Sequence, residues 1–213
     1  DDVIVFSRSV TDHLGHVDNV LQLLRKAGVT LKLSKCAFFQ PRVDYLGHVI
    51  SPGKLAVASQ NAEAFRKAIF PQSLTQLRSF LGAANVYRRF IRDYSRIARP
   101  LNRMLSKDAN PDWGDPTEEQ TEAFETLKEK LVSPPILSLP MKGRPFMIDT
   151  DASAYQLGAV LLQQQDPDKP REWVPIGFWS RTLNAAERNY SATERECLSV
   201  VWAVKTLRPY IEG

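Results

Sequence analysis

Long apolar runs, cysteines and histidines are all scarce in this chain of 213 residues. No stretch approaches the roughly 18 apolar residues that a membrane-spanning helix needs, and no charged segment followed by an apolar one opens the sequence. A membrane or secreted protein is therefore not expected, and we expect an intracellular one. The length fits one large domain or two small ones, with enough residues for a real hydrophobic core.

The few cysteines and histidines do not form a metal site by their spacing. Cys36 and Cys197 are far apart in sequence, so we expect two buried thiols in a reducing compartment and no disulfide. His13 and His16 have the i, i+3 spacing of a possible zinc pair. No third or fourth ligand follows at a suitable spacing, so surface histidines near the start of a helix are favoured.

Two adjacent acids open the chain in the segment DDVIVFS. This pattern is typical of a hairpin in which Asp1 and Asp2 occupy the turn and Val3–Ser7 form the outgoing strand, with the partner strand preceding residue 1. Paired carboxylates in such a turn could hold Mg²⁺, a hard ion that prefers oxygen ligands. Acids in turns are more often simply solvated, so the residues alone leave both interpretations open.

Apolar periodicity predicts a mixture of helices and strands along the rest of the chain. Helical spacing covers residues 14–27, 58–69, 74–94, 118–133 and the stretch from residue 192 onward. Strands are predicted at residues 30–39, 43–50, 174–181, and as two successive strands within 146–163. Three capping boxes mark helix starts, at Ser73–Gln76, Thr117–Gln120 and Ser191–Glu194.

The helix predicted from Leu74 to about Tyr94 carries its arginines on one side. At about 100° per residue they fall within a sector of about 100° beside the apolar face. The row contains Arg78, Arg88, Arg89, Arg92 and Arg96, and Arg99 and Arg103 extend it. Guanidinium groups match phosphate oxygens, whereas a merely solvated face usually mixes charges of both signs. Only Asp93 interrupts the row, so phosphate binding is favoured over a solvated face.

Two acids near the end of the chain point to a second site. In FMIDTDASAYQLGAVLLQ, the period of two places Asp149 and Asp151 on one face of the first strand. Asp151 either caps the turn that follows or binds a metal. Glu196 lies near the start of an otherwise apolar helix, where we expect it to be half-buried; it either pairs with the helix dipole or shares Mg²⁺ with Asp151. Two such carboxylates suit phosphodiester hydrolysis by a two-metal mechanism.

Eight segments of the chain are specific enough to compare with a known family. They are DDVIVFS, KCAFF, YLGHVIS, LRSFLGAANVYRRFI, YSRIARPL, TDASAYQLGAVL, FWSRTL and NYSATERECLSVVWA. In this order they resemble the reverse transcriptase and ribonuclease H part of a gypsy-like LTR retrotransposon Pol polyprotein. The resemblance covers the chain from end to end.

The resemblance implies an α+β fold: the end of a palm sheet, a helical thumb, and a partial RNase H-like α/β unit of antiparallel hairpin strands followed by a helix. It implies four segments. They are residues 1–53 as the end of the palm with the primer grip, 54–105 as the thumb, 106–144 as a connection with a helix, and 145–213 as the truncated RNase H-like domain.

The resemblance also assigns roles to single residues. Asp1 and Asp2 match the last two acids of the polymerase YxDD turn, and Leu46, Gly47 and His48 match the primer grip. Asp151 and Glu196 match the first two metal-binding acids of ribonuclease H. The implied cofactor is Mg²⁺, with Mn²⁺ as an alternative. The implied partners are an RNA/DNA hybrid, a DNA template-primer, dNTP in the intact parent and the remainder of the Pol polyprotein, with no membrane.

The departures from the family pattern bear on activity. The first polymerase aspartate and the third and fourth ribonuclease H acids have no match within these residues. We therefore expect the 213-residue chain to be inactive alone, while its parent is an RNA-directed DNA polymerase with ribonuclease H activity, located in a cytoplasmic virus-like particle or in the nucleus. A domesticated or decayed copy that binds nucleic acid or protein without catalysis is the alternative.

Overall fold

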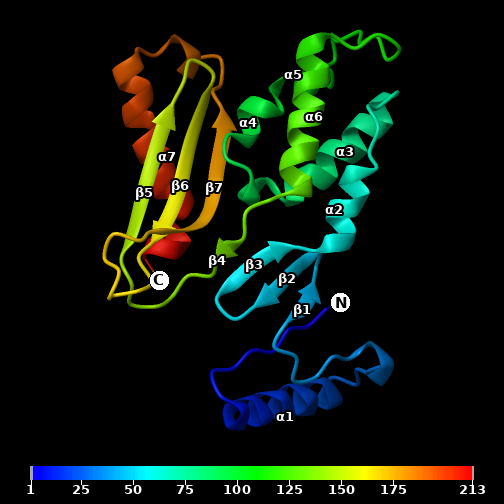
Figure 1. Ribbon diagram of the computed structural model, residues 1–213, viewed down its shortest axis with the longest axis vertical. Coiled ribbons are helices and arrows are strands. Elements are labelled where there is room, and N and C mark those ends of the chain that lie inside the picture. The colour runs from blue at the N-terminus through cyan, green and yellow to red at the C-terminus, as the bar shows by residue number, and fades with distance from the viewer. Residues whose placement is uncertain (1, 213) are drawn as a thin grey trace. The chain divides into compact units, whose positions relative to one another are not determined.

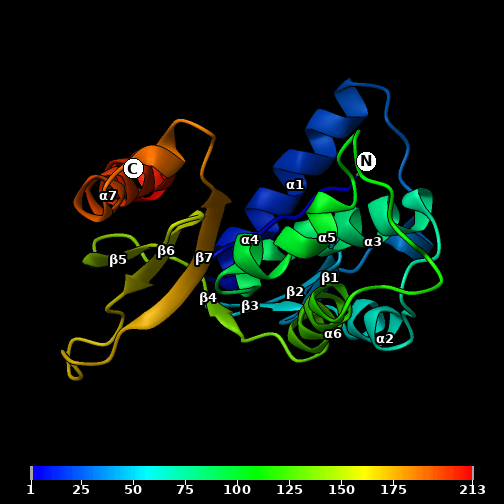
Figure 2. The same ribbon diagram turned by 90° about the horizontal axis from the view of Figure 1, so that it is seen from above.

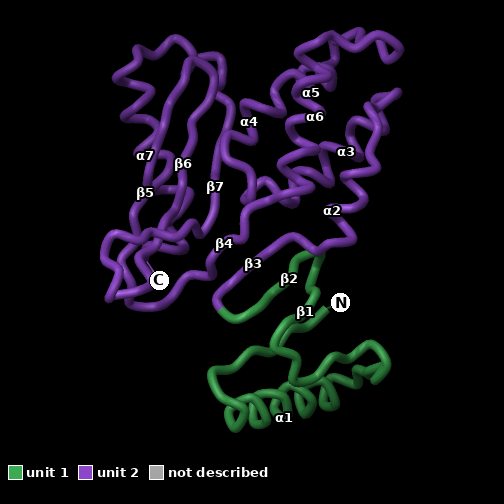
Figure 3. The backbone as a smooth tube through the Cα atoms, in the orientation of Figure 1, with its two compact units in different colours: residues 1–52 green, residues 53–213 purple. Residues whose placement is uncertain are grey.

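The structure is a computed structural model that describes residues 2–212. The chain divides into two compact units, residues 1–52 and 53–213 (Figure 3). Both units combine helices with antiparallel strands, so the predicted α+β class is confirmed. No helix within residues 2–212 is both long enough and apolar enough to cross a membrane.

The first unit consists of one long helix and a small hairpin. Its elements are α1 (Val10–Lys26), the 3₁₀ turn η1 (Leu33–Lys35), β1 (Val43–Tyr45) and β2 (His48–Ser51). The Ser9 hydroxyl caps α1 by accepting a hydrogen bond from the Asp12 backbone N–H at 3.1 Å. Gly28 follows the helix with a φ of 70°, the left-handed conformation in which a glycine commonly ends a helix. None of the residues of α1 is buried, so this unit does not cover the apolar face of the helix.

The strands predicted in the first unit are partly wrong. Val3–Ser7 and residues 30–39 form no strand in the structure. The strand predicted over residues 43–50 is a hairpin, because Leu46 and Gly47 have φ values of 48° and 80°. Positive φ at both central residues defines a tight two-residue turn between antiparallel strands. A strand also needs a neighbour for its backbone N–H and C=O groups, and residues 3–7 have none within the described chain.

Helices dominate the first half of the second unit (Figure 1). They are α2 (Ser59–Arg66), α3 (Leu74–Val86), η2 (Arg88–Phe90), α4 (Tyr94–Ile97), α5 (Arg99–Arg103) and α6 (Glu118–Val132). The short strands β3 (Lys54–Val57) and β4 (Leu137–Ser138) pair antiparallel.

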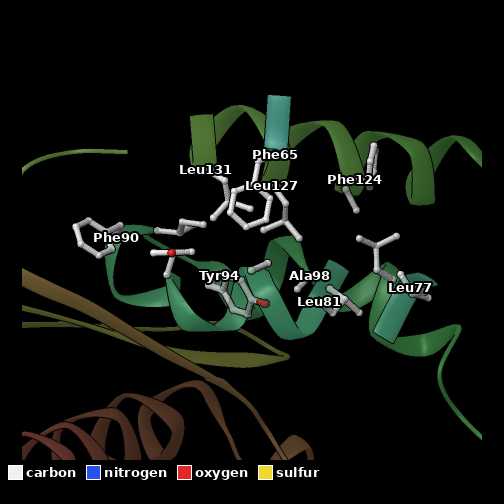
Figure 4. Packing of buried hydrophobic residues seen from close by; sticks show 14 of the residues in the cluster. Phe65, Leu77, Leu81, Phe90, Tyr94, Ala98, Phe124, Leu127 and Leu131 are labelled. Carbon is white, nitrogen blue, oxygen red and sulfur yellow. The ribbon is translucent and has the colours of Figure 1, made fainter. Parts of the chain in front are cut away.

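The helices share one hydrophobic core (Figure 4). Thr117 and Gln120 form the predicted capping box at the start of α6. Four apolar residues of α6 are buried, and they are Ala123, Phe124, Leu127 and Leu131. Together with Phe65 and Leu77 they build the core of this half. The helix predicted over residues 118–133 is confirmed.

The single helix predicted over residues 74–94 is wrong beyond Val86. The chain leaves α3 there, passes through η2, and takes up a left-handed conformation at Asp93, with a φ of 60°, before α4 begins. Aspartate tolerates this conformation better than most residues. At the start of α3, Ser73 caps as predicted, but the Gln76 side chain accepts from the Gln72 backbone N–H instead of completing the box. The arginines therefore do not lie along one helix.

An antiparallel sheet and a long helix form the second half of this unit. The strands are β5 (Phe146–Ala152), β6 (Gln156–Gln163) and β7 (Val174–Thr182), in that order, followed by α7 (Ala192–Ile211). Figure 2 shows α7 over one face of the sheet, where Ala203 and Leu207 pack against Leu161 and Ile176. The capping box of Ser191 and Glu194 is confirmed.

Candidate functional site

The acids of β5 lie on the face of the sheet that α7 does not cover. Asp151 is the cross-strand partner of Gly158, and Asp149 is the partner of Val160. Ile148 packs into the core under α7. Because side chains alternate along a strand, Asp149 and Asp151 project from the opposite face. A Cβ built on Gly158 would lie 3.7 Å from the Asp93 carboxylate, so this face looks toward the segment between η2 and α4.

A small crevice lies beside these acids. Its volume is about 10 Å³, which is room for about one water. Its lining residues include Asp149, Asp151, Arg92 and Asp93. Arg92 approaches Asp149 to 3.9 Å, and Asp93 accepts a hydrogen bond from the Gln156 side chain at 3.2 Å. Asp151 has no ion-pair partner within residues 2–212, so its charge is open to a cation from outside.

Glu196 is more exposed than the sequence predicted. Helix α7 begins at Ala192, so Glu196 is its fifth residue and lies beyond the first turn. The helix dipole acts most strongly within the first turn, so it stabilises Glu196 less than a residue there. The predicted half-burial is wrong: Glu196 is exposed. The buried residues of α7 are Ser199, Ala203 and Leu207, so burial against the sheet begins only about one turn after Glu196. Burial therefore does not force a cation onto Glu196.

Asp151 and Glu196 nevertheless lie at the same end of the sheet. The end of β7 at Thr182 pairs with Gln156 at the start of β6, next to the turn that follows Asp151. The connection from β7 therefore starts α7 at that end, as Figure 1 shows. At about 100° per residue, Glu196 falls on the same stripe of α7 as Ala203, which faces the sheet. Among residues 2–212, no group of three or more His, Cys, Asp or Glu side chains could hold a metal ion.

An ion pair fixes the connection that brings Glu196 to this end. The Arg181 guanidinium donates to both oxygens of Glu187, at 2.7 and 2.8 Å. Glu187 also accepts from the Asn184 backbone N–H at 2.9 Å, and Arg181 lies over the Trp202 ring. These hydrogen bonds lower the pKa of Glu187 from 4.5 to about 2. Glu187 thus locks the loop before α7 in one conformation.

We expect this lock to weaken in acid. Because the pKa of Glu187 is lowered in the folded protein, its stabilising contribution is present above about pH 4.5 and is lost as the pH falls toward 2. Glu187→Gln lacks that carboxylate. The difference in thermal midpoint between wild type and Glu187→Gln should therefore shrink over this range. Midpoints recorded across it check the prediction, and Glu172→Gln, which removes an exposed partner of Lys169, is the control. A difference that did not change with pH would contradict it.

Arg88 points toward β7 instead of outward. Its guanidinium donates to the Ser180 carbonyl at 2.5 Å and lies over the Tyr94 ring at 5.5 Å. Next to it, the Ser95 backbone N–H donates to the Ser180 hydroxyl at 2.9 Å. Burial raises the pKa of Tyr94 to about 12, which keeps the phenol neutral. These contacts join the η2–α4 segment to the sheet.

Arg89 reinforces the same junction. Its guanidinium stacks on Trp179 and Tyr210, 5.2 and 5.6 Å from the two ring centroids, and donates to the Ile176 carbonyl at 3.4 Å. A Cβ at Gly177 would meet the Trp179 ring at 3.0 Å and the Arg89 Nε at 3.3 Å. A glycine is therefore needed for Arg89 to pack this closely against the sheet.

The other arginines of the predicted row remain at the surface. Arg78 on α3 is exposed, and so are Arg92 and Arg96. Arg96 approaches Asp93 to 3.4 Å, and Arg92 approaches Asp149 to 3.9 Å. Both distances are long for an ion pair and both arginines are open to water, so these pairs hold the guanidinium groups only weakly.

In the first unit, the predicted polymerase residues lie around the β1–β2 hairpin. Leu46 and Gly47 form its turn, and the His48 ring nitrogen Nδ1 lies 3.0 Å from the Leu46 carbonyl. Asp2 is exposed, and its carbonyl accepts a hydrogen bond from the Tyr45 hydroxyl at 3.2 Å. Asp1 lies outside the described residues. The structure thus places Asp2 beside the strand that leads into the hairpin.

The histidines and cysteines were not favoured as metal ligands by the sequence. His13 and His16 both approach the Ser7 hydroxyl, at 3.0 and 2.8 Å. His13 is partly buried and His16 is exposed. The prediction of two buried thiols is wrong, because Cys36 is only partly buried and Cys197 is exposed on α7. Neither forms a disulfide.

Two family models match this chain, at its two ends. Residues 117–213 match the family described as an RNase H-like domain found in reverse transcriptase. Residues 1–50 match the family described as reverse transcriptase, an RNA-dependent DNA polymerase.

Curated relatives match over all 213 residues. The chain is 40% identical to the Retrovirus-related Pol polyprotein from transposon 297 of Drosophila melanogaster, of which it covers 19%. It is 36% identical to the Transposon Tf2-3 polyprotein of Schizosaccharomyces pombe, of which it covers 16%. The chain therefore spans less than a fifth of the length of these relatives.

Solved structures share the fold. A foamy viral protease-reverse transcriptase in complex with an RNA/DNA hybrid matches 95% of this chain with a TM-score of 0.78 and 22% identity, and 27% of that chain is covered. The same protein in complex with dsDNA matches 96% of this chain with a TM-score of 0.77 and 22% identity, and 42% of that chain is covered. At this identity the likeness concerns the fold alone.

The matched families and the curated relatives make the chain homologous to reverse transcriptase polyproteins. Within that class, it is homologous to the reverse transcriptase and RNase H-like region of LTR retrotransposon Pol polyproteins.

Proposed function

We propose that this chain belongs to a gypsy-like element and is the template-handling region of an RNA-directed DNA polymerase with ribonuclease H activity. In this proposal the Asp2 end contributes to nucleotidyl transfer, and the Asp151 and Glu196 end contributes to cleavage of the RNA strand. The observation that carries it is the placement of Asp151 and Glu196, both exposed, at one end of the sheet.

The chemistry of these carboxylates fits a divalent cation. Asp149 already has Arg92 beside it, whereas Asp151 and Glu196 have no ion-pair partner within residues 2–212. Hard cations prefer carboxylate oxygens, so Asp151 and Glu196 would hold Mg²⁺ or Mn²⁺. A bound Mg²⁺ supplies an activated water and charge stabilisation for phosphodiester hydrolysis. The residues of this chain contribute the carboxylate ligands. The ion pair between Arg181 and Glu187 fixes the loop before α7 and so helps to position Glu196.

The proposed nucleic-acid surface is narrower than the arginine row. We keep Arg78, Arg92 and Arg96 in it, because they are exposed and weakly paired. Arg88 and Arg89 instead serve the junction with β7. The β1–β2 turn with Leu46, Gly47 and His48 is the proposed primer grip. The substrates in the parent would be an RNA/DNA hybrid, a DNA template-primer and dNTP.

The exposed arginines give a test of nucleic-acid binding. Replacing Arg78, Arg92 and Arg96 together by glutamine should make the salt dependence of hybrid affinity shallower by about two to three in log K against log salt, because each phosphate contact contributes about 0.9. Fluorescence anisotropy with a labelled RNA/DNA hybrid measures the slope. A triple variant of the exposed Lys67, Lys130 and Lys142 removes the same charge and should change the slope less. Equal changes in both variants would mean that net charge alone explains binding.

Catalysis in the parent is a separate part of the proposal. We propose that the 213-residue chain does not cleave a hybrid by itself, whereas the polyprotein region that contains it does so in the presence of Mg²⁺. If that region bound hybrids but did not cleave them, the protein would instead be a domesticated or decayed copy that serves as a binding module. The proposed location is a cytoplasmic virus-like particle or the nucleus.

A further inference from the structure

A stacked pair of side chains, the partly buried Arg99 and the exposed Tyr155, lies at the same end of the sheet as Asp151. The Arg99 guanidinium carbon is 3.8 Å from the centroid of the Tyr155 ring. Tyr155 belongs to the turn between β5 and β6, and its side chain is half exposed. This is the shortest of the cation–π distances found within residues 2–212. Arg99 extends the arginine row predicted from the sequence, whereas its contact with Tyr155 was not predicted.

Both members of the pair are held by the backbone beneath them. The Ser153 hydroxyl accepts hydrogen bonds from the backbone N–H groups of Tyr155 and Gln156, at 3.2 and 3.1 Å. The Tyr155 carbonyl accepts from the Leu183 N–H at 2.8 Å. On the other side, Arg99 opens α5 and stands beside the fully buried Ala98. The stack is therefore a fixed feature of the surface, formed between two anchored segments.

The N–H donors of the Arg99 guanidinium are unused within residues 2–212. Arg88 and Arg89 donate to carbonyls of β7, and Arg92 and Arg96 stand beside aspartates. In the described part of the chain, no carboxylate or carbonyl accepts a hydrogen bond from the Arg99 guanidinium. Stacking on a ring uses the flat face of the guanidinium and leaves its N–H edge free. That edge is the part that binds a phosphate with two parallel hydrogen bonds.

We propose that Arg99, oriented by Tyr155, is a phosphate clamp that holds the backbone of a nucleic-acid strand next to the Asp151 and Glu196 end of the sheet. The proposal rests on the proposed function, because the clamp gains its role from the hybrid that this end would receive. A polyanion is the partner that fits, since Arg92 and Arg96 add positive charge on the neighbouring surface. A phosphate contact reads no bases, so the clamp would position the strand without sequence preference.

The test is the affinity of the 213-residue chain for a labelled RNA/DNA hybrid as a function of salt. Arg99→Gln should weaken binding about tenfold, the effect of losing one hydrogen-bonded charge contact. It should also reduce the salt slope by about one. Arg103→Gln is the matched control, because Arg103 lies on the same helix, is left out of the proposed nucleic-acid surface and approaches Glu119 to 3.8 Å; the affinity of this variant should stay within about twofold of wild type.

Three further substitutions distinguish the planar guanidinium group of Arg99 and its stacking on Tyr155 from its positive charge. Arg99→Lys keeps the charge but loses the planar fork, so affinity should fall while the salt slope stays near that of wild type. Tyr155→Phe keeps the ring and should bind as wild type does, whereas Tyr155→Ser should lose part of the affinity. Thermal melting of each variant confirms that it is folded.

The outcomes that overturn the clamp differ from those that overturn the proposed function. If the wild-type chain binds the hybrid with a salt-dependent affinity and Arg99→Gln weakens binding no more than Arg103→Gln does, the clamp is wrong and the proposed function stands. Arg99→Lys at wild-type affinity would also overturn the clamp, because a point charge would then suffice. Wild-type protein that bound no hybrid would overturn both.

Discussion

Asp151→Asn should abolish cleavage of the RNA strand of a hybrid by the polyprotein region that contains this chain, with a loss of at least about a hundredfold. Removing even an outer-shell partner of a metal site costs about 10- to 100-fold, and Asp151 is proposed as a direct ligand. The amide keeps the shape of the side chain but loses the negative charge that a divalent cation requires. Cleavage of a labelled RNA strand in Mg²⁺, at saturating hybrid, measures the effect.

Asp149→Asn is the matched control for this prediction. Asp149 lies two residues away on the same face of β5, and Arg92 already stands 3.9 Å from its carboxylate. Its loss should change cleavage only a few-fold, because its charge is partly compensated by that arginine. If cleavage survived in Asp151→Asn and vanished in Asp149→Asn, the proposed assignment of the metal to Asp151 would be wrong. Hybrid affinity measured in parallel shows whether either change acts through binding instead.

Elements with local signals were predictable from the sequence. Helix α6 is an example, because its cap at Thr117, its apolar period and the proline after it are all contained in one short segment. The strands β5 and β6 are another, since the period of two placed Asp149 and Asp151 on one face correctly. In these segments the local preference and the tertiary fold agree.

Elements that depend on distant residues were not predictable. The periodic pattern after α3 continues past Val86, yet the chain turns there because Arg88 and Arg89 bond to strand β7, about ninety positions later. A period carries no information about such partners, so tertiary contacts override it. The strand predicted at Val3–Ser7 does not form. Here a partner is missing, because no neighbouring strand within the described chain completes the backbone hydrogen bonds.

The features of the candidate site also differ in whether local sequence predicts them. The strand-end position of Asp151 follows from local alternation, and the capping role of Glu194 follows from its spacing to Ser191. The exposure of Glu196 does not, because it depends on where along α7 the sheet begins to cover the helix. The stack of Arg99 on Tyr155 joins residues 56 positions apart, and only the folded chain reveals it.

The core on which this site rests should be sensitive to a single truncation, Phe124→Ala. Phe124 is 0% exposed and packs against the rings of Phe70 and Phe80, with centroids 5.4 and 4.7 Å away. Removing the ring should lower the free energy of unfolding by about 3–5 kcal/mol, because apolar contacts are lost and a cavity remains. The thermal midpoint should fall by roughly 6 to 20 °C. Ile69→Ala, at a side chain 76% exposed, should cost less than about 0.5 kcal/mol. Equal shifts in the two variants, measured by circular dichroism, would show that α6 does not anchor the helices that carry the arginines.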